Sequence, residues 1–531
     1  MNIFSWTTII VCLFYFVVGV LLSRYVKKLD DYYVAGRAMP AIAVGGSFMA
    51  AWTSMVGLVG GAGAGWAWGL GTWLLFYGSF WGIVMFSMVF ALPMRRGEFL
   101  TVPDYFTALF ESKRIRAVCA LVVVFSMGGY FIAQIVGAGV IIEGLTGMPY
   151  AYGMWLFTLT MAAYVVFGGM MAVVITDTLM FFAFLLCALA MPYMLDHFGG
   201  WEFLMVKLPE IRPGIWKLAG FQQGSAGPFT ASWWIGASVA YFAMTAISPA
   251  QLSRAFTAKN EKSLLQGMAW GFPFVMIMLI CVGVAMLMVN AEVSKLGPQI
   301  PKTDYAIGYL MKNMLPPWLG VVILSGLLAA GISTANVCLL VLAQGVGRDI
   351  YQKLINPTVT DKKLILVTRI VVGVATVILG LIAQLKFPWI IMVGTWAIGS
   401  TAPTLLPAAL AGLFWRRTTE KAIYHSMLWG LVVYAVLIFI ETQLMTTQAF
   451  LKAMVLPSIL WAVILSGITL LVLTYTTKST PVQQKTWDDL HAKMFPKERA
   501  HATTANWVWM LIPAVIFVVF IIWFMGKVIG T

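Results

Sequence analysis

The stretch that decides the fold is GGSFMAAWTSMVG, at residues 45–57. It is apolar enough to lie within a membrane, but it begins and ends with glycine and places the hydroxyls of Thr53 and Ser54 in mid-run. Every carbonyl of an intact transmembrane helix is hydrogen-bonded, whereas a broken helix frees carbonyls that can bind a cation or a solute. The stretch therefore predicts a transmembrane helix interrupted near the middle of the bilayer. The glycines that follow, from Gly60 to Gly65, fit close helix packing equally well.

The composition of the whole chain places this helix in a membrane protein. Of 531 residues, 61% are hydrophobic and 10% are charged, against about 45–50% and 25% in soluble domains. This composition excludes an ordinary soluble protein. We expect residues 1–531 to form a single polytopic domain in the lipid bilayer.

Fourteen apolar runs are long enough to cross a bilayer. They lie near 3–22, 42–66, 72–92, 118–142, 152–168, 171–195, 231–248, 266–290, 318–346, 364–385, 389–413, 423–441, 451–475 and 505–527. The expected fold class is therefore all-α, with about fourteen transmembrane helices.

The seventh run, 231–248, also contains polar residues and a helix breaker. These are Tyr241, Thr245 and the pair Ser248-Pro249. The run comes five helices after the second, as an inverted repeat of five plus five helices with broken members would require. On this basis the expected organisation is a leading helix, two inverted repeats and three accessory helices with a cytoplasmic loop. The leading helix lies in 1–30, the first repeat in 42–195 and the second in 231–413. The accessory helices lie in 423–531, with the loop at 476–504.

The net charge of +14 comes from 34 Lys and Arg against 20 Asp and Glu. These basic residues occur singly or in pairs in short loops without interleaved aromatic residues, which excludes a nucleic-acid partner. Lys and Arg accumulate on the cytoplasmic side of membrane proteins. Placing both termini outside puts 25 of the 34 basic residues in cytoplasmic loops and their flanks, so we expect a multi-pass protein of the cell (inner) membrane with that orientation.

The residues that metal sites and enzyme active sites need are scarce. The four histidines are scattered, and the five cysteines lie in apolar runs without CxxC spacing. The cysteines are Cys12, Cys119, Cys187, Cys281 and Cys338. We expect buried thiols, no disulfide, no metal site of this kind and no membrane-embedded enzyme.

The ninth run contains AAGISTAN, residues 329–336, which places two adjacent hydroxyls and an amide within one turn. Ser333 and Thr334 could simply bond back to their own helix, as such residues commonly do in membranes. Combined with carbonyls freed in the broken second run, they would instead form a set of uncharged oxygens. Such a set suits a monovalent cation, because hard cations prefer oxygen ligands.

Six segments in order resemble the sodium/solute symporter family, and they cover roughly residues 30–430. They are DYYVAGR (31–37), TVPDYF (101–106), GGMMAVVITD (168–177), RAFTAK (254–259), ST (333–334) leading to RDIY (348–351), and GLFWRR (412–417). The resemblance implies the leucine-transporter-like inverted-repeat fold and, from the span count, the fourteen-helix, sugar-transporter-like branch. It also implies import of a small organic solute together with a sodium ion by alternating access.

The resemblance carries over a main sodium site made of three carbonyls and two hydroxyls. The residues are Ala50, Thr53 and Ala330 for the carbonyls and Ser333 and Thr334 for the hydroxyls. A second cation site would use Asp177, Ser333 and positions 336 and 337. Asn336 can ligate an ion but Val337 cannot, so we expect one sodium ion per solute. Asp177 is equally well explained as an interface acid, and an alternative function is proton coupling with Asp177 as the carrier.

The expected solute cavity differs from that of sugar carriers. Trp52, Gly57 and Phe76 stand where the resemblance places an amide, a glutamine and a glutamate in those carriers. A sugar needs many hydrogen bonds, so an amino acid or a small carboxylate is favoured. Tyr241, Thr245 and Trp396 are expected to line or gate the cavity, although each could equally be structural. We expect no membrane-embedded Arg or Lys that could pair with the carboxylate of a solute. A small acid would then rely on the helix N-termini at the broken runs and on the bound cation.

Two polar stretches are expected to carry short helices. In 486–495, Thr486 and Asp489 resemble a capping box, and Trp487, Leu490 and Met494 share one helical face. This pattern predicts a helix on the inner membrane surface, with an unstructured loop as the alternative. The stretch 303–314 predicts a short helix over the external mouth. We expect the transporter to function as a monomer.

Overall fold

The computed structural model describes residues 2–217, 231–288, 303–387, 390–444 and 457–496, together with six single positions between 512 and 523. The first half contains α1 (Ile3–Leu22), α2 (Leu29–Val34), α3 (Ala41–Trp52), α4 (Gly61–Trp68), α5 (Trp73–Met85), α6 (Ala91–Gly97), α7 (Val102–Phe110), α8 (Lys113–Thr146), α9 (Tyr150–His197), α10 (Gly200–Glu202) and α11 (Leu208–Ile211). The second half contains α12 (Ala231–Ile247), α13 (Pro249–Thr257), α14 (Glu261–Met288), α16 (Ala306–Asn313), α17 (Pro317–Gln344), α18 (Asp361–Ala383), α19 (Ile390–Gly399), α20 (Thr401–Thr404), α21 (Leu406–Phe414), α22 (Glu420–Leu444), α24 (Ser458–Thr476) and α25 (Pro481–Met494).

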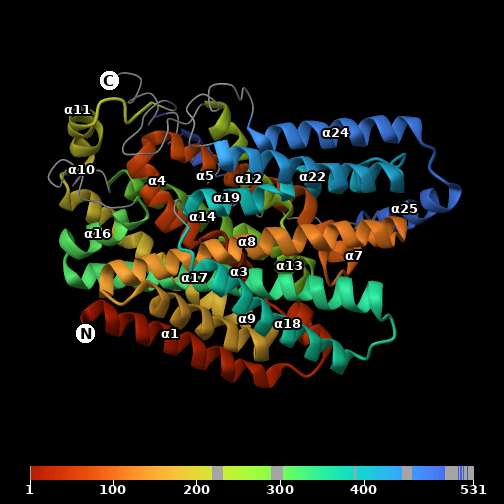
Figure 1. Cartoon of the computed structure of the whole chain (residues 1–531), viewed down its shortest axis with the longest axis horizontal. Coiled ribbons are helices and arrows are strands. Elements are labelled where there is room, and N and C mark those ends of the chain that lie inside the picture. The colour runs from red at the N-terminus through yellow and green to blue at the C-terminus, as the bar shows by residue number, and fades with distance from the viewer. Residues whose placement is uncertain are drawn as a thin grey trace.

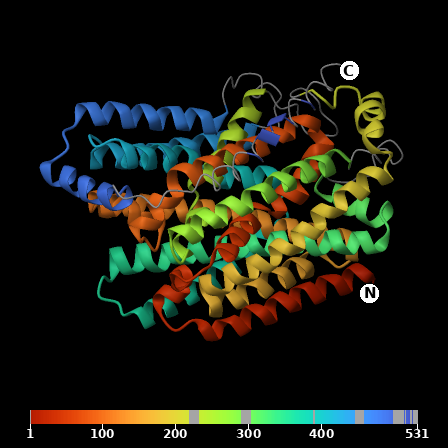
Figure 2. The same cartoon turned by 180° about the vertical axis from the view of Figure 1, so that it is seen from behind.

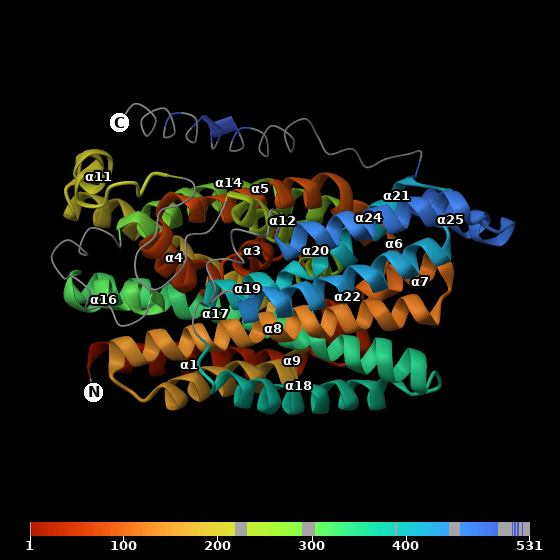
Figure 3. The ribbon, with the colours of Figure 1, turned by 45° about the horizontal axis from the view of Figure 1, so that its top comes forward.

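The long helices run roughly along the longest axis of the molecule, which is horizontal in Figure 1. The short helices α10, α11 and α16 gather at one end, and α7 and α25 lie at the other (Figure 1). The pair α22 and α24 lies along the upper edge in Figure 1 and α1 along the lower edge, and Figure 3 shows α1 and α18 together at the bottom. From behind, the short α3 lies beside α14 in the centre (Figure 2). The short α3 is thus packed against α9, α14 and α17.

Ten helices of the described residues are long and apolar enough to cross a membrane. Three features of the chain account for part of the difference between these ten helices and the fourteen apolar runs of the sequence. The second run is split, because α3 is only 12 residues long and the chain from Val56 onward continues into the third run. The fifth and sixth runs meet without a loop inside α9. The fourteenth run, 505–527, lies outside the described residues except for single positions.

The predicted interruption of the second run is confirmed. The first half, α3, ends at Trp52, and Thr53 is extended, with φ −83° and ψ 126°. Helical structure resumes as a π-helical turn at Val56–Gly60 and continues into α4. The amide N–H of Met55, at the start of this second half, donates to Gln134 Oε1 of α8 at 2.8 Å. A side chain of a neighbouring helix thus replaces the helical partner that the break removes.

The seventh run is broken as well, which confirms the second predicted interruption. The helix α12 ends at Ile247, Ser248 is extended, and Pro249 begins α13. Proline fits the first position of a helix because its missing N–H would have no partner there. The side chain of Ser248 accepts from the N–H of Gln251 at 3.4 Å.

The two halves of α9 meet at Gly169, whose φ of 51° and ψ of −147° are not helical. A Cβ atom at this position would lie 2.6 Å from the carbonyl oxygen of Tyr32. Glycine is required here, because an L side chain would have both an unfavourable φ and a clash. The expected boundary between the fifth and sixth runs therefore exists, although it is a sharp bend rather than a loop.

The surface helix predicted in 486–495 exists as α25, but its predicted start was wrong. The capping box is formed by Thr480 and Gln483, with Pro481 at the first helical position. The sequence reading stopped at the wrong Thr because the pattern of Thr followed by an acid or amide occurs twice in this segment. The second predicted helix is confirmed as a 3₁₀ turn at Thr303–Tyr305 followed by α16.

Candidate functional site

The central feature of the molecule is the meeting of α17 with the open end of α3. Ser333 Oγ donates to the carbonyl oxygen of Ala50 at 2.9 Å and lies 3.0 Å from the carbonyl oxygen of Ala330. Thr334 Oγ1 donates to the carbonyl oxygen of Thr53 at 2.9 Å. All five oxygens that the sequence singled out are therefore brought together, and all five residues are buried.

These two hydroxyls differ from most hydroxyls in the helices. Thr376 and Thr158, for example, donate to carbonyls one turn back in their own helices, at 2.7 Å. Thr334 instead donates across to the carbonyl of Thr53, directly after α3, and Ser333 donates to the Ala50 carbonyl of α3 in addition to its own turn. These carbonyls can accept because α3 stops at Trp52 and offers them no further helical N–H.

The second cluster lies next to this oxygen set and contains an ion pair. Asp177 of α9 and Arg254 of α13 are completely buried, and Arg254 Nη2 lies 2.8 Å from Asp177 Oδ2. Ser47 Oγ donates to the same carboxylate oxygen at 2.9 Å, and Asn336 Nδ2 donates to the other at 3.0 Å. The cluster joins α3, α9, α13 and α17, the helices that surround the oxygen set.

Arg254 is a buried cation whose pairing with Asp177 the sequence did not indicate. The expectation that no Arg or Lys within the membrane pairs with the carboxylate of the solute stays a prediction. The orientation argument counted Arg254 among the 25 basic residues of the cytoplasmic loops and their flanks. In the structure the chain remains helical past the break at Ser248, so Arg254 is on α13, inside the protein. A long arginine side chain can reach a carboxylate from there.

Three predicted cavity residues form an aromatic cluster beside the break in α3. The ring of Phe76 lies 6.3 Å from that of Trp52 and 6.4 Å from that of Tyr241, measured between centroids. A Cβ atom at Gly57 would be 3.8 Å from the ring of Phe76, so the backbone of Gly57 borders the same cluster. The Tyr241 hydroxyl is buried and has no hydrogen-bond partner among the described residues.

Thr245 and Trp396 are placed differently. Thr245 Oγ1 donates to the carbonyl oxygens of Ser79 and Tyr241, at 2.9 and 3.0 Å, at the contact of α12 with α5. Its hydroxyl therefore serves the packing of these helices. Trp396 is on α19, where its carbonyl oxygen accepts from Tyr434. No ring contact joins it to the aromatic cluster in the part of the chain that the structure describes.

Sequence reasoning missed two polar residues at the break, Tyr130 and Gln134 of α8. The hydroxyls of Ser54 and Tyr130 lie 3.0 Å apart, and Gln134, one turn further along α8, accepts from the backbone at Met55. The Nε2 group of Gln134 is buried without a partner among the described residues. A tyrosine and a glutamine at i and i+4 in an apolar run would have been the available signal, since buried amides in membranes need partners.

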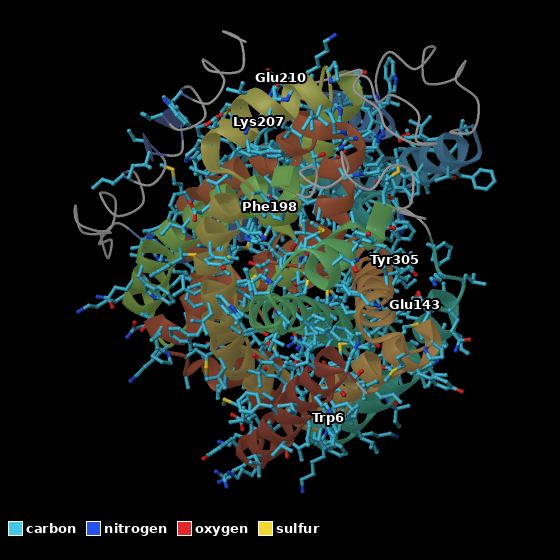
Figure 4. All side chains as sticks on the ribbon, turned by 90° about the vertical axis from the view of Figure 1, so that its left-hand side faces the viewer. Trp6, Glu143, Phe198, Lys207, Glu210 and Tyr305 are labelled. Carbon is cyan, nitrogen blue, oxygen red and sulfur yellow. The ribbon has the colours of Figure 1, made fainter. Side chains whose placement is uncertain are left out.

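Charged residues close both ends of the bundle. At the end with α16, Glu143 accepts from Lys386 Nζ at 2.6 Å and from the Tyr305 hydroxyl, and Figure 4 shows Glu143 and Tyr305 side by side. At the other end, Asp104 binds Arg116 at 3.0 Å and Arg348 at 3.1 Å. Burial alone would raise the pKa of Asp104, but the two guanidinium groups outweigh it and hold that pKa below its usual value.

No group of three or more His, Cys, Asp or Glu residues suited to a metal ion occurs in the described ranges. The neutral oxygens that meet between α3 and α17 are of the kind that bind a hard cation, and they lie next to a partly polar aromatic cluster. This combination fits ion-coupled binding of a solute better than bond-making chemistry.

Comparison with known proteins agrees with this interpretation. The chain is 26% identical over 457 residues to the sodium/pantothenate symporter of Haemophilus influenzae, an alignment that covers 83% of this chain and 92% of the relative. It is 26% identical over 441 residues to the sodium/proline symporter of the same organism, with coverages of 78% and 84%. The solved structure of a Na⁺-coupled sialic acid symporter superposes with a TM-score of 0.70 at 16% identity, covering 90% of this chain and 98% of that one.

The structural similarity confirms the leucine-transporter-like fold. The relatives confirm that the protein is a secondary transporter, with sodium as the coupling ion and a small organic solute as cargo, and not an enzyme. The sequence also matches the model of the family described as "Sodium:solute symporter family" from residue 32 to residue 430. Because this match extends over most of the chain, the protein belongs to the sodium:solute symporter family.

Proposed function

We propose that one sodium ion binds where the carbonyl oxygens of Ala50, Thr53 and Ala330 meet the hydroxyl oxygens of Ser333 and Thr334. The observation that carries this proposal is that both hydroxyls reach from α17 to the open end of α3. A cation among these atoms would replace the hydroxyl–carbonyl hydrogen bonds with ion–oxygen contacts. The set has no formal charge, which suits a monovalent cation that must also be released.

The coupling of ion and solute follows from the position of Trp52. This residue is the last of α3, directly before Thr53, and its ring belongs to the aromatic cluster. An ion that fixes the Thr53 carbonyl also fixes the neighbouring indole, and thereby completes the solute cavity. The sodium gradient then drives import, with the membrane potential contributing about 2.3 kcal/mol per charge per 100 mV.

The polar groups at the cavity favour a solute rich in hydrogen-bond acceptors. Tyr241 and Gln134 each offer a buried donor that has no partner among the described residues. A carboxylate accepts such donors, and the end of the broken helix together with the sodium ion would balance its charge. Pantothenate and proline, the solutes of the two relatives, are both carboxylic acids. We therefore favour an amino acid or a small carboxylate over a sugar.

We also propose a stoichiometry of one sodium ion per solute. Asp177 and Asn336 could supply oxygens to a second cation, but Val337 offers none. Asp177 is in addition paired with Arg254. Proton transfer by Asp177 is disfavoured for the same reason, because a guanidinium group already balances its charge.

The membrane arrangement is part of the proposal. We infer fourteen transmembrane helices, with inverted repeats at 42–195 and 231–413 and accessory helices in 423–531. The end that carries α7 and α25 would face the cytoplasm, because Arg95, Arg96 and other basic residues gather there. Both termini would then lie on the external side of the cell (inner) membrane. Each monomer would be a complete transporter.

Uptake into proteoliposomes tests the proposal. The purified protein should accumulate at least one solute from a panel of radiolabelled amino acids, short monocarboxylates, pantothenate and sugars, with saturable dependence on external sodium. Replacement of sodium by choline at fixed pH should reduce uptake to the level of empty liposomes. Equal uptake in choline, or collapse by a protonophore while a sodium gradient persists, would contradict it.

A further inference from the structure

The outer side of the bundle carries an apolar groove between α3, α9 and α14, with a volume of about 800 Å³. We propose that this groove holds an acyl chain of an anionic phospholipid of the cytoplasmic leaflet, whose headgroup lies at Lys259 and Lys262. The choice of leaflet rests on the proposed orientation of the protein. The site itself depends neither on the sodium site nor on the solute cavity.

The lining of the groove is suited to a hydrocarbon chain rather than to a polar solute. The ring of Phe181 lies 5.5 Å from the rings of Trp270 and Phe274, measured between centroids, and meets both edge to face. The indole N–H of Trp270 is already used, because it donates to the Ala41 carbonyl at 3.1 Å. Apart from Gln266 at one end, the other described residues that line the groove have apolar side chains. An acyl chain needs no hydrogen bond, whereas a solute site needs a few well-placed polar groups.

The rim of the groove faces away from the bundle, toward the lipid. Ile42, Phe182 and Ile277 are 54%, 46% and 44% exposed, whereas Phe181 and Ala269 are buried. All five residues lie in apolar runs that the sequence predicts to cross the membrane, so hydrocarbon rather than water is the surrounding medium. A lipid chain in the groove gains dispersion contacts on several sides, which a chain on a flat helix surface does not.

The length of the groove matches one leaflet of a bilayer. Along α14 its lining runs from Gln266 to Ile277, which corresponds to about 16 Å of helix. The hydrocarbon core of a bilayer is roughly 30 Å thick, so the groove covers about half of it. A single acyl chain therefore fits with its headgroup end at Gln266 and its methyl end at Ile277.

Two lysines at this end of the groove indicate an anionic headgroup. Lys262 precedes Gln266 by one helical turn on the same side of α14, and Lys259 stands just before the helix. Both lysines are exposed, and neither has an ion-pair partner within the ranges that the structure describes. The acid between them, Glu261, is already paired with Arg96 at 2.7 Å. Such lysines attract the phosphate of an anionic lipid at the cytoplasmic surface.

The groove borders the start of α3, whose other end carries the proposed sodium ligands. A Cβ atom at Gly45 would lie 2.4 Å from the carbonyl oxygen of Gly267, so α3 and α14 meet closely at these glycines. An acyl chain that packs against Ile42 and Trp270 would support this contact from the lipid side. The lipid would thus help to hold the base of α3 without entering the sodium site.

Photo-crosslinking of the full-length protein in liposomes tests the site. The liposomes contain phosphatidylcholine and, in both leaflets, phosphatidylglycerol with a diazirine in its acyl chain, so the result does not depend on the orientation of the protein. Labelled peptides should come from 181–185 and 270–277 in clear excess over Ile370 and Val374 of α18, which are equally exposed. Labelling should saturate with the phosphatidylglycerol fraction, and the same diazirine on phosphatidylcholine should label the groove weakly.

Two variants separate the headgroup from the chain. Lys259→Gln/Lys262→Gln should raise the phosphatidylglycerol fraction for half-maximal labelling at least fivefold, because even one lysine near the surface changes the affinity for anionic lipid about fivefold. The matched control is Lys362→Gln/Lys363→Gln, which changes two exposed lysines at the start of α18 and should leave this fraction unchanged. Ala269→Phe places a ring in the groove and should reduce its labelling to the level of α18.

Three results would overturn the inference. The first is equal labelling of the groove and of α18 in the wild type, and the second is equal labelling of the groove by the two phospholipids. The third is an unchanged half-maximal fraction in Lys259→Gln/Lys262→Gln. A groove without any lipid label would be covered by protein, either by residues 505–527 or by a second copy, and would overturn the inference as well. Sodium enters none of these measurements, so their failure leaves the proposed sodium site untouched.

Discussion

The neutral oxygen set and the Asp177–Arg254 ion pair lie between the same helices, α3 and α17, yet they are built on opposite principles. In the first, hydroxyls of α17 meet carbonyls of α3 without any formal charge. In the second, two full charges are buried against each other. A neutral set can gain and lose a cation at modest cost, whereas a buried pair that loses one member is left with an unbalanced charge. We therefore expect the neutral oxygen set to bind and release the sodium ion, and the ion pair to hold its helices together throughout.

The largest effect should follow from breaking the ion pair. Asp177→Asn leaves the Arg254 guanidinium buried without a counter-charge, which should cost about 3–5 kcal/mol of stability. We expect a strongly lowered Tm in detergent, in sodium and in choline alike. The double variant Asp177→Asn/Arg254→Gln is the matched control and should recover most of the loss. A single variant as stable as the wild type would show that the pair does not hold these helices together.

The next effect should appear in the neutral set. Ser333→Ala and Thr334→Ala each remove one ligand while the bulk and helicity of α17 barely change. Each should raise the sodium concentration for half-maximal transport at least tenfold, equivalent to about 1.4 kcal/mol, with normal expression and nearly normal Tm. The control is Ser325→Ala, because Ser325 Oγ donates only to the Val321 carbonyl of its own helix. If Ser333 and Thr334 merely served their own helix, all three variants would share one sodium dependence.

How much the sequence could predict differs between the two clusters. The break at Thr53-Ser54 and the pair Ser333-Thr334 stand out in apolar runs, and the resemblance to the symporter family implied the full set with Ala50 and Ala330, so all five oxygens could be named in advance. The partner of Asp177 could not be named in advance. Arg254 reaches Asp177 only because the chain resumes as the buried helix α13 after Ser248, and the packing of that helix cannot be read from the sequence. Hydropathy also counts runs rather than helices, so it could not reveal that the chain bends within α9 at Gly169 without leaving helical structure on either side.

The cavity was predicted only in part for a related reason. Trp52, Phe76 and Tyr241 do meet in one cluster. Thr245 could not be separated from them by sequence, because a threonine that serves a helix contact and one that faces a cavity look alike. The same holds for Trp396, since tryptophan is common throughout this chain and its direction depends on the rotation of α19.

A smaller effect is expected at Trp52, which lies between the ion and the solute. Trp52→Ala removes an indole whose ring contacts Phe76. The variant should admit bulkier analogues of the transported solute, or raise KM several-fold if the ring stacks on the solute, while the sodium dependence stays close to that of the wild type. Competition by a series of analogues of increasing size measures this. Trp81→Ala, at a ring that is exposed on the outer surface, should change neither property, and the same result for Trp52→Ala would place Trp52 outside the cavity.

The smallest effect concerns an exposed ion pair, which shows that burial and not charge alone gives Asp177 its importance. Lys493 of α25 donates to Glu98 at 2.9 Å and holds the pKa of that carboxyl below its usual value. A lowered pKa stabilises the protein above the unfolded pKa, about 4.3, and the contribution is lost as the pH falls through the folded pKa. Exposed pairs contribute well under about 1 kcal/mol.

Glu98→Gln should therefore lower Tm slightly and by the same amount at every pH from about 5 to 8. The difference from the wild type should shrink as the pH falls below the usual glutamate pKa, about 4.3, and vanish once the pH is below the folded pKa of Glu98. Thermal unfolding of both proteins across this range is the measurement. A large difference at neutral pH, comparable with that of Asp177→Asn, would mean that α25 contributes far more to stability than an exposed surface contact can.

The most direct test of the central claim is the affinity of the purified protein for ²²Na⁺, compared between the wild type and the double variant Ser333→Ala/Thr334→Ala. The wild type should bind sodium saturably, and the double variant should bind it at least tenfold more weakly while its Tm in choline remains near that of the wild type. If both proteins bind sodium with the same affinity, the meeting of α17 with the open end of α3 is not the sodium site.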